Sequence, residues 1–146
     1  MIKITRVDER LVHGQVAFAW TNSLGADCIL VVNDEAAADK IRATTLKLAA
    51  PAGIKFSIKS VADAIALLNG TKTDKYKVFV IVGNTDDALK LVENVKGVDH
   101  INLGNMKKTE SRRIITNSLA VDDHDVRNIR AMVQDRKSTR LNSSHL

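Results

Sequence analysis

The chain has 146 residues, of which 45% are hydrophobic and 27% charged, as expected for one soluble globular domain. Only 3% are aromatic, which argues against a nucleic-acid surface built on base stacking. The net charge of +5 does not indicate nucleic-acid binding either, because Arg136, Lys137 and Arg140 contribute to it from a short C-terminal stretch without acidic residues.

No apolar run approaches the roughly 20 residues of a membrane span, and the first residues lack the apolar core of a signal peptide. The single Cys28 lies in an apolar run, where we expect a buried side chain in a reducing compartment. These features together predict a cytoplasmic protein.

The first half of the chain alternates strand and helix patterns. Residues 2–7 are an apolar, β-branched run typical of a strand, and a helix is expected over 14–24, ended by Gly25. The continuous apolar run 27–33 predicts a second strand that is buried on both faces, as in a parallel sheet. A helix over 36–48 is expected to follow it.

The alternation continues in the second half. Residues 54–58 predict a third strand, and Ser60 is placed to cap a helix over 61–68. A strand over 77–82 and a helix over 88–95 come next.

The last part of the chain has shorter elements. A strand is expected over 98–103, short extended pieces at 114–115 and 119–121, and a helix over 124–134. Such alternation predicts an α/β fold, a single-domain, mainly parallel, doubly wound sheet with helices on both faces.

Two parts of the chain differ in composition. We expect the domain to span 1–135, and 136–146 to be a disordered, Ser-rich tail that need not be native to it.

Most of the reactive side chains lie between the first strand and the first helix. Asp8, Arg10 and His13 follow the strand, where ligands collect in open α/β sheets, and the start of the helix suits an anion. A neutral imidazole is a competent nucleophile toward phosphorus, and an arginine gives forked, charge-assisted hydrogen bonds. Asp8 is expected either to hold the second ring nitrogen of His13 or to orient Arg10.

The backbone of this loop can also bind an anion through a nest of N–H groups. The candidate phosphate-binding residues are Leu11, Val12, Gly14 and Gln15, with Thr85 as a hydroxyl donor from the end of another strand. A plain helix-capping role remains the simpler interpretation of Thr85.

Other chemistries lack their motifs. There is no Gly-x-Gly-x-x-Gly, Walker-type or Gly-x-Ser-x-Gly sequence, which argues against dinucleotide, ATP or serine-hydrolase sites. His13, His100, His124 and His145 share no ligand spacing, so no metal site and no cofactor are expected.

Ordinary structural roles are favoured for the remaining polar residues. We expect Arg6 and Glu9 to form a solvated ion pair, and Trp20 to belong to the core. Asn84 and Asn105 are expected to cap loops, although they could line the rim of the same site. A basic cluster is expected to be a solvated loop, with a partner surface as the alternative; it comprises Lys107, Lys108, Arg112 and Arg113.

The first loop resembles the phosphorylation loop of the mannose/fructose/sorbose-family IIB component of the phosphoenolpyruvate-dependent sugar phosphotransferase system. The resemblance continues through Asn33-Asp34, residues 82–84 and residues 101–106, and covers about 1–135. The loop positions that carry it are Arg6, Asp8, Arg10, His13, Gly14, Gln15 and Val16.

This resemblance implies a protein-N(pi)-phosphohistidine–sugar phosphotransferase that uses no metal or nucleotide directly. His13 would accept a phosphoryl group from the phosphohistidine of a IIA component and pass it to a sugar entering through membrane IIC and IID components. Asp8 and Arg10 match the residues that position it. The resemblance further implies a cytoplasmic protein held at the membrane through the transporter components, and it leaves the sugar and a homo-oligomer open.

The C-terminal end departs from the family, whose members continue into a turn and a further strand. Here the tail from Arg136 replaces that region, which leaves the last strand of the sheet in question.

Two alternatives stay open on the residues alone. One is a non-catalytic α/β module that binds an anionic metabolite at the first strand–helix loop. The other is a basic nucleic-acid binder, which depends on the tail alone.

Overall fold

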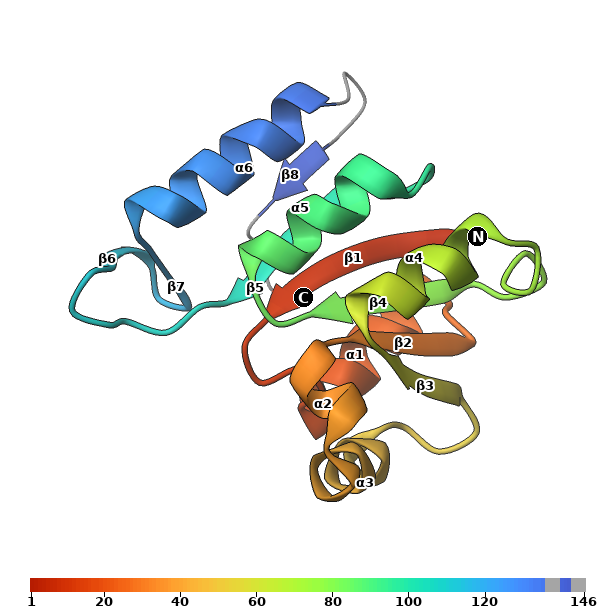
Figure 1. The fold of residues 1–146 in the computed structure, drawn as a ribbon. Helices are drawn as coiled ribbons and strands as arrows, with labels where there is room; N and C mark the ends of the chain where they lie inside the picture. Colours follow the sequence, from red (N-terminus) through yellow and green to blue (C-terminus); the bar gives the residue numbers. More distant parts are fainter. Residues whose placement is uncertain (136–139, 143–146) are drawn as a thin grey trace.

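The computed structural model of the chain describes residues 1–135 and 140–142 (Figure 1). The strands are β1 (Ile2–Asp8), β2 (Cys28–Val32), β3 (Lys55–Lys59), β4 (Val78–Val82), β5 (His100–Asn105), β6 (Arg113–Thr116), β7 (Leu119–Val121) and β8 (Arg140–Asn142). The helices are α1 (Gly14–Leu24), α2 (Asp34–Ala38), α3 (Lys40–Ala49), α4 (Val61–Asn69), α5 (Thr85–Asn94) and α6 (Asp123–Asp135).

The main sheet has the strand order β3-β2-β4-β1-β5-β8, and every neighbouring pair in it is parallel. Strands β6 and β7 form a separate antiparallel hairpin. Figure 1 shows α1, α2 and α3 on one side of the sheet and α4, α5 and α6 on the other. The predicted doubly wound α/β fold is thereby confirmed.

Alternating side chains of the strands supply the two cores. In β2, Ile29 and Val31 pack in the cluster that includes Trp20 of α1, whereas Leu30 and Val32 pack with the residues of α4 and α5 on the opposite face. This is why the apolar run is continuous, since both faces of each inner strand are covered by helices. Cys28 is buried, as expected.

One predicted helix is divided in two. The expected helix over 36–48 is interrupted at Asp39, whose extended backbone (φ −113°, ψ 105°) separates α2 from α3. The Asp39 carboxylate accepts hydrogen bonds from the N–H groups of Ile41 and Arg42, at 3.0 and 3.2 Å. The side chain thus competes with the helical backbone and caps a new helix.

Other boundaries differ by a few residues. Helix α5 begins at Thr85 rather than at residue 88, because the Asn84 side chain accepts a hydrogen bond from the Asp87 N–H at 2.8 Å and caps it. Strand β5 begins at His100 rather than at residue 98.

Part of the predicted tail forms a strand. Arg140–Asn142 pair in parallel with His100–Asn102 of β5, which departs from the expectation of a disordered tail in this short stretch. The pairing uses backbone groups that the edge of β5 would otherwise leave unpaired, so it needs no particular side-chain pattern. The remaining tail positions, 136–139 and 143–146, lie outside the described residues.

The chain connections diverge next to the first loop. Strands β1 and β4 are neighbours, and the helices that follow them, α1 and α5, lie on opposite faces of the sheet. Such a divergence at the carboxyl ends of parallel strands is where open α/β folds bind ligands. No helix in the described part of the chain is long and apolar enough to cross a membrane.

Candidate active site

The loop between β1 and α1 has a fixed backbone. The Leu11 N–H donates to the Asp8 carbonyl oxygen at 2.9 Å, and Leu11 adopts a left-handed conformation (φ 60°), which within residues 1–135 and 140–142 no other non-glycine residue has. Its side chain and that of Val12 are buried in the core cluster beneath α1. A strained residue of this kind persists only where its surroundings hold it, and strain of this kind is common at functional sites.

The buried Asp8 carboxylate fixes the loop through hydrogen bonds that it accepts from Arg10. It is 1% exposed, and its Oδ1 accepts hydrogen bonds from the backbone N–H and the Nε–H of Arg10, both at 3.0 Å. Its Oδ2 accepts from Arg10 Nη2 at 2.9 Å. This fork fixes the guanidinium plane of Arg10, and the bonded carboxylate raises the pKa of Arg10.

Arg6 is a second arginine that contacts the Asp8 carboxylate. Its side chain is buried rather than solvated, and it makes no ion pair with Glu9, so that expectation was wrong. Arg6 Nη1 donates to Asn102 Oδ1 at 2.6 Å, and Nη2 lies 3.4 Å from Asp8 Oδ2. Burial lowers the pKa of Arg6, and the Asp8 charge opposes that effect.

Two neighbours enclose the Arg6 guanidinium. It lies over the Trp20 ring, 5.2 Å from the ring centroid. On another side lies Gly104, where a Cβ atom would come within 2.1 Å of Arg6 Cζ. Gly104 is therefore required by the space that Arg6 occupies, and Trp20 is a core residue, as predicted.

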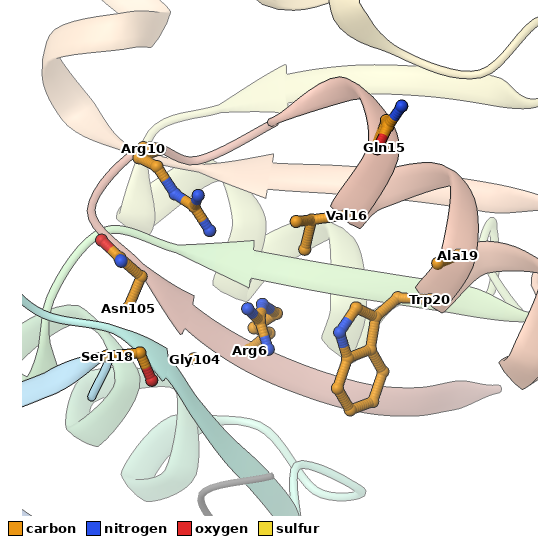
Figure 2. A pocket seen from close by; sticks show the side chains of 9 residues that line it. All are labelled: Arg6, Arg10, Gln15, Val16, Ala19, Trp20, Gly104, Asn105 and Ser118. Carbon is orange, nitrogen blue, oxygen red and sulfur yellow. The ribbon is translucent and has the colours of Figure 1, made fainter. Parts of the chain in front are cut away.

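A pocket of about 380 Å³ opens beside these groups (Figure 2). Figure 2 shows the side chains of Arg6 and Arg10 extending into the space between α1 and β1. Two guanidinium groups give this pocket a positive character that suits an anion. It is lined by Arg6, Arg10, Gln15, Val16, Ala19, Trp20, Gly104, Asn105 and Ser118.

His13 lies at the start of α1, outside the set of residues that line the pocket. It is exposed, and as the N-cap residue it makes no side-chain hydrogen bond to the helix. The first turn of α1 contains no acidic residue, so the positive end of the helix dipole is not neutralised there. The imidazole is thus presented to solvent next to N–H groups that have no partner within the helix.

The four predicted phosphate-binding residues of this loop differ in whether they can still contact an anion. Gln15 lines the pocket and Gly14 opens the helix, whereas the Leu11 N–H is already bonded to Asp8 and does not serve an anion. Val12 contributes a buried side chain, and any role of its backbone N–H stays a prediction.

Thr85 does not belong to this site. It is 1% exposed, its hydroxyl donates to Asp125 Oδ1 at 2.8 Å, and it accepts from Asn128 Nδ2 at 3.0 Å. Its single hydroxyl proton is therefore directed to α6, which argues against the predicted role as phosphate donor. The capping role was also wrong, because Asn84 caps α5.

Sequence reasoning missed one ion pair at the loop. Arg112 was expected in a solvated basic cluster, but its guanidinium pairs with the Glu9 carboxylate, and the two side chains are only 16% and 21% exposed. Glu9 also accepts a hydrogen bond from the Lys107 N–H at 3.2 Å. The two partners are 103 positions apart in the sequence, so no local pattern points to the pair.

The described part of the chain holds no group of three or more His, Cys, Asp or Glu residues placed to bind a metal ion. The groups that the described residues bring to this site are an exposed imidazole, a fixed guanidinium and a helix N-terminus.

Comparisons with known proteins show the family and the fold of this chain. The family model for the sorbose subfamily IIB component of the phosphotransferase system (PTS) matches residues 2–142. A sorbose-specific EIIB component from Lacticaseibacillus casei is 37% identical over 134 residues, which is 92% of this chain and 82% of that protein. The crystal structure of an N-acetylgalactosamine-specific IIB component from Escherichia coli superimposes with a TM-score of 0.92 at 30% identity, covering 99% of this chain and 94% of that one.

Some relatives are longer than this chain. The mannose-specific EIIAB component of Escherichia coli K12 is 35% identical over 126 residues, which is 86% of this chain but 39% of that protein. A 44% identical relative from Streptococcus pyogenes is covered over 65% of its length, and 73% of this chain is matched. The match to the family model spans nearly the whole chain, so this protein belongs to the sorbose subfamily of PTS IIB components.

Proposed function

We propose that this chain is a phosphoryl carrier that accepts a phosphoryl group on His13 from the phosphohistidine of a IIA component and passes it to a sugar. The observation that carries the proposal is the exposed His13 at the start of α1, two residues before Gln15 of the arginine-lined pocket. Family membership favours this function over a non-catalytic module that binds an anionic metabolite.

The transfer to His13 exchanges one N–P bond for another. A lone pair on one ring nitrogen of His13 attacks the phosphorus of the donor, in line with the donor N–P bond. A new N–P bond forms as the old one breaks, and the donor imidazole leaves with the electron pair. Each ring keeps its other N–H, so the step needs no net proton transfer, and the main task of the protein is positioning.

Arg10 is suited to stabilise the charge on the moving group. A guanidinium has five N–H donors, and Asp8 takes the Nε–H and one Nη2–H. The other three are left to bind phosphoryl oxygens as charge-assisted donors. The N–H groups of Gly14 and Gln15 in the first turn of α1 add neutral donors next to His13.

The role of Asp8 follows from its partners. Both of its oxygens accept hydrogen bonds from arginines, so we assign Asp8 to orienting Arg10 rather than to holding the His13 ring. Asp8 thereby acts through Arg10.

In the second step, a sugar hydroxyl attacks the same phosphorus and the His13 N–P bond breaks. The hydroxyl proton passes to the departing His13 nitrogen or to water. This reaction is that of a protein-N(pi)-phosphohistidine–sugar phosphotransferase. The sugar would be presented by membrane IIC and IID components, with this chain at the cytoplasmic face, and the fused EIIAB relative from Escherichia coli supports a IIA component as donor.

The test is incubation with phosphoenolpyruvate, the general phosphotransferase proteins and a IIA component. One phosphate that is labile in acid and stable in base is expected per chain, and His13→Ala should abolish it. His124→Ala is the matched control, since His124 is exposed but lies on α6, and it should keep the label. Label retained by His13→Ala would overturn the proposal.

A further inference from the structure

We propose that Arg112 is a positioning residue, which holds the phosphorylation loop in its reactive geometry through Glu9. The inference deepens the proposed function and relies on it for the reaction, but the contacts that support it are independent of that reaction.

Arg112 joins three separate segments of the chain. Its Nη1 pairs with Glu9 Oε1 and also donates to the Lys107 carbonyl oxygen at 3.0 Å. Its Nε lies 3.4 Å from Asp125 Oδ2 on α6. A single planar guanidinium thus connects the loop after β1, the loop after β5 and the first turn of α6.

Glu9 makes three contacts with the end of β5 and the loop that follows it. Its N–H donates to the Asn105 carbonyl oxygen at 3.1 Å, Oε2 accepts from the Lys107 N–H, and Oε1 is paired with Arg112. Since Glu9 directly precedes Arg10, these contacts fix the peptide from which the Arg10 side chain and the strained turn at Leu11 emerge.

Asp125, which Arg112 contacts on α6, is itself held by hydrogen bonds. Asp125 is buried and accepts hydrogen bonds from the Thr85 hydroxyl at 2.8 Å and from the Asp122 N–H at 3.1 Å. Arg112 is therefore anchored to the packed pair α5 and α6. The loop is held from two directions, through Asp8 by Arg6 and through Glu9 by Arg112.

The contribution of Arg112 is one of geometry. It does not line the pocket beside Arg10, and its pair with Glu9 lies outside the two apolar core clusters. A small displacement of a reacting group, on the other hand, slows a reaction by up to about a hundredfold. Loss of Arg112 should therefore affect the rate of transfer much more than the folding of the domain.

The first experiment measures single-turnover phosphoryl transfer from a phosphorylated IIA component at varied IIA concentration. Arg112→Ala should lower the maximal rate by about ten- to a hundredfold and leave the half-saturating concentration unchanged. Arg112→Lys should recover part of the rate, because one ammonium group can replace the Glu9 contact but not the Asp125 contact as well. Arg113→Ala is the matched control, since Arg113 pairs with Asp123 in an exposed pair (65% and 82%).

A double-mutant cycle separates action through Glu9 from direct contact with the donor. Glu9→Gln should slow transfer on its own, and adding it to Arg112→Ala should cause no further loss. Independent, additive losses would overturn the proposal. So would a raised half-saturating concentration in Arg112→Ala that Glu9→Gln does not share, because Arg112 would then contact the donor.

A second measurement keeps this inference separate from the proposed function. In the unphosphorylated protein, Arg112→Ala should speed amide hydrogen exchange at residues 9–13 and leave the core strand β4 unchanged. Should the natural chain take up no phosphate, the proposed function fails and the exchange result alone decides on Arg112. Unchanged exchange at residues 9–13 would overturn the inference in either case.

Discussion

The geometry of the loop depends on one buried carboxylate. Asp8 is 1% exposed, and Arg6 and Arg10 compensate its charge in the interior. The same contacts that stabilise it orient Arg10 next to the start of α1. Structural support and the proposed chemical role thus belong to the same carboxylate.

Replacing Arg10 by Ala should slow phosphoryl transfer by about a hundred- to a thousandfold, because it removes the charged donors that stabilise the moving group. The Arg10 side chain is partly exposed, so the circular dichroism spectrum should not change. Arg10→Lys should recover little, since an ammonium group cannot reproduce the fork to Asp8. Transfer at the natural rate in Arg10→Ala would remove its role.

A methyl group at Gly104 should disturb the site by displacing Arg6. The added Cβ would overlap Arg6 Cζ, so Gly104→Ala should cost about 1–3 kcal/mol in the free energy of unfolding, measured by chemical denaturation. Gly14→Ala is the matched control for stability, because the nearest atom to its Cβ is the Ala49 carbonyl oxygen at 3.9 Å. Equal stability of both variants would show that Arg6 can move aside at little cost.

The grouping of the candidate site residues was predictable from the sequence, and the residues that support them were not. His13, Arg10 and Asp8 lie within six positions of each other, so a strand end, a loop and a helix start are enough to bring them together. The expectation that Arg6 is solvated follows from its sequence neighbours alone. Its partner Asn102 is 96 positions away on β5, and the pairing of β1 with β5 decides its burial.

At the level of elements, α5 and α6 are joined by polar residues that their sequence patterns do not indicate. Both helices were predicted from apolar spacing, and besides apolar packing the contact between them includes the buried polar residues Thr85, Asp125 and Asn128. Asn84 and Thr85 are both good capping residues, and only the three-dimensional position of α6 decides that Asn84 caps and Thr85 faces the neighbouring helix.

Thr85→Val tests this assignment. It should lower the free energy of unfolding by about 1–3 kcal/mol, because Asp125 and Asn128 lose a buried hydrogen-bond partner. Phosphoryl transfer should change little at temperatures where the variant is folded, because Asp125 still accepts the hydrogen bond from the Asp122 N–H. The exposed Thr71→Val serves as control for the loss of a hydroxyl. Slower transfer without a change in stability would restore Thr85 as a phosphate ligand.

Element boundaries were predictable where a side chain marks them. Gly25 ends α1 in the left-handed conformation (φ 64°), and the Ser60 hydroxyl accepts from the Asp63 N–H at 3.1 Å, both as expected. The break at Asp39 was missed, since an aspartate inside an Ala-rich helical pattern can either face solvent or start a new helix.

At the scale of the whole molecule, the fold class follows from the apolar runs, and the strand order does not. Continuous apolar runs at β2 and β4 require helices on both faces. The placement of β1 between β4 and β5 is a property of the assembled sheet. That placement brings Gly104 and Asn105 next to Arg10 and so completes the pocket beside the first loop.

The acid dependence of stability should include a contribution from Asp86. The hydrogen bond from Asn128, and then the contact with His124, lower the pKa of Asp86. A lowered carboxyl pKa stabilises the fold above the pKa of the unfolded chain, and this contribution is lost as the pH falls through the folded pKa. Asp86→Asn should therefore lose less stability than the natural chain between about pH 5 and pH 3, as measured by urea unfolding. Parallel curves would contradict this assignment.

The central claim, that His13 carries the phosphoryl group, is tested most directly by phosphorus NMR of the chain after phosphorylation by a IIA component. One phosphoramidate signal is expected from the natural chain, and the same signal should be absent from His13→Ala. A phosphoramidate signal that persists in His13→Ala, or a phosphoester signal in the natural chain, would contradict the account.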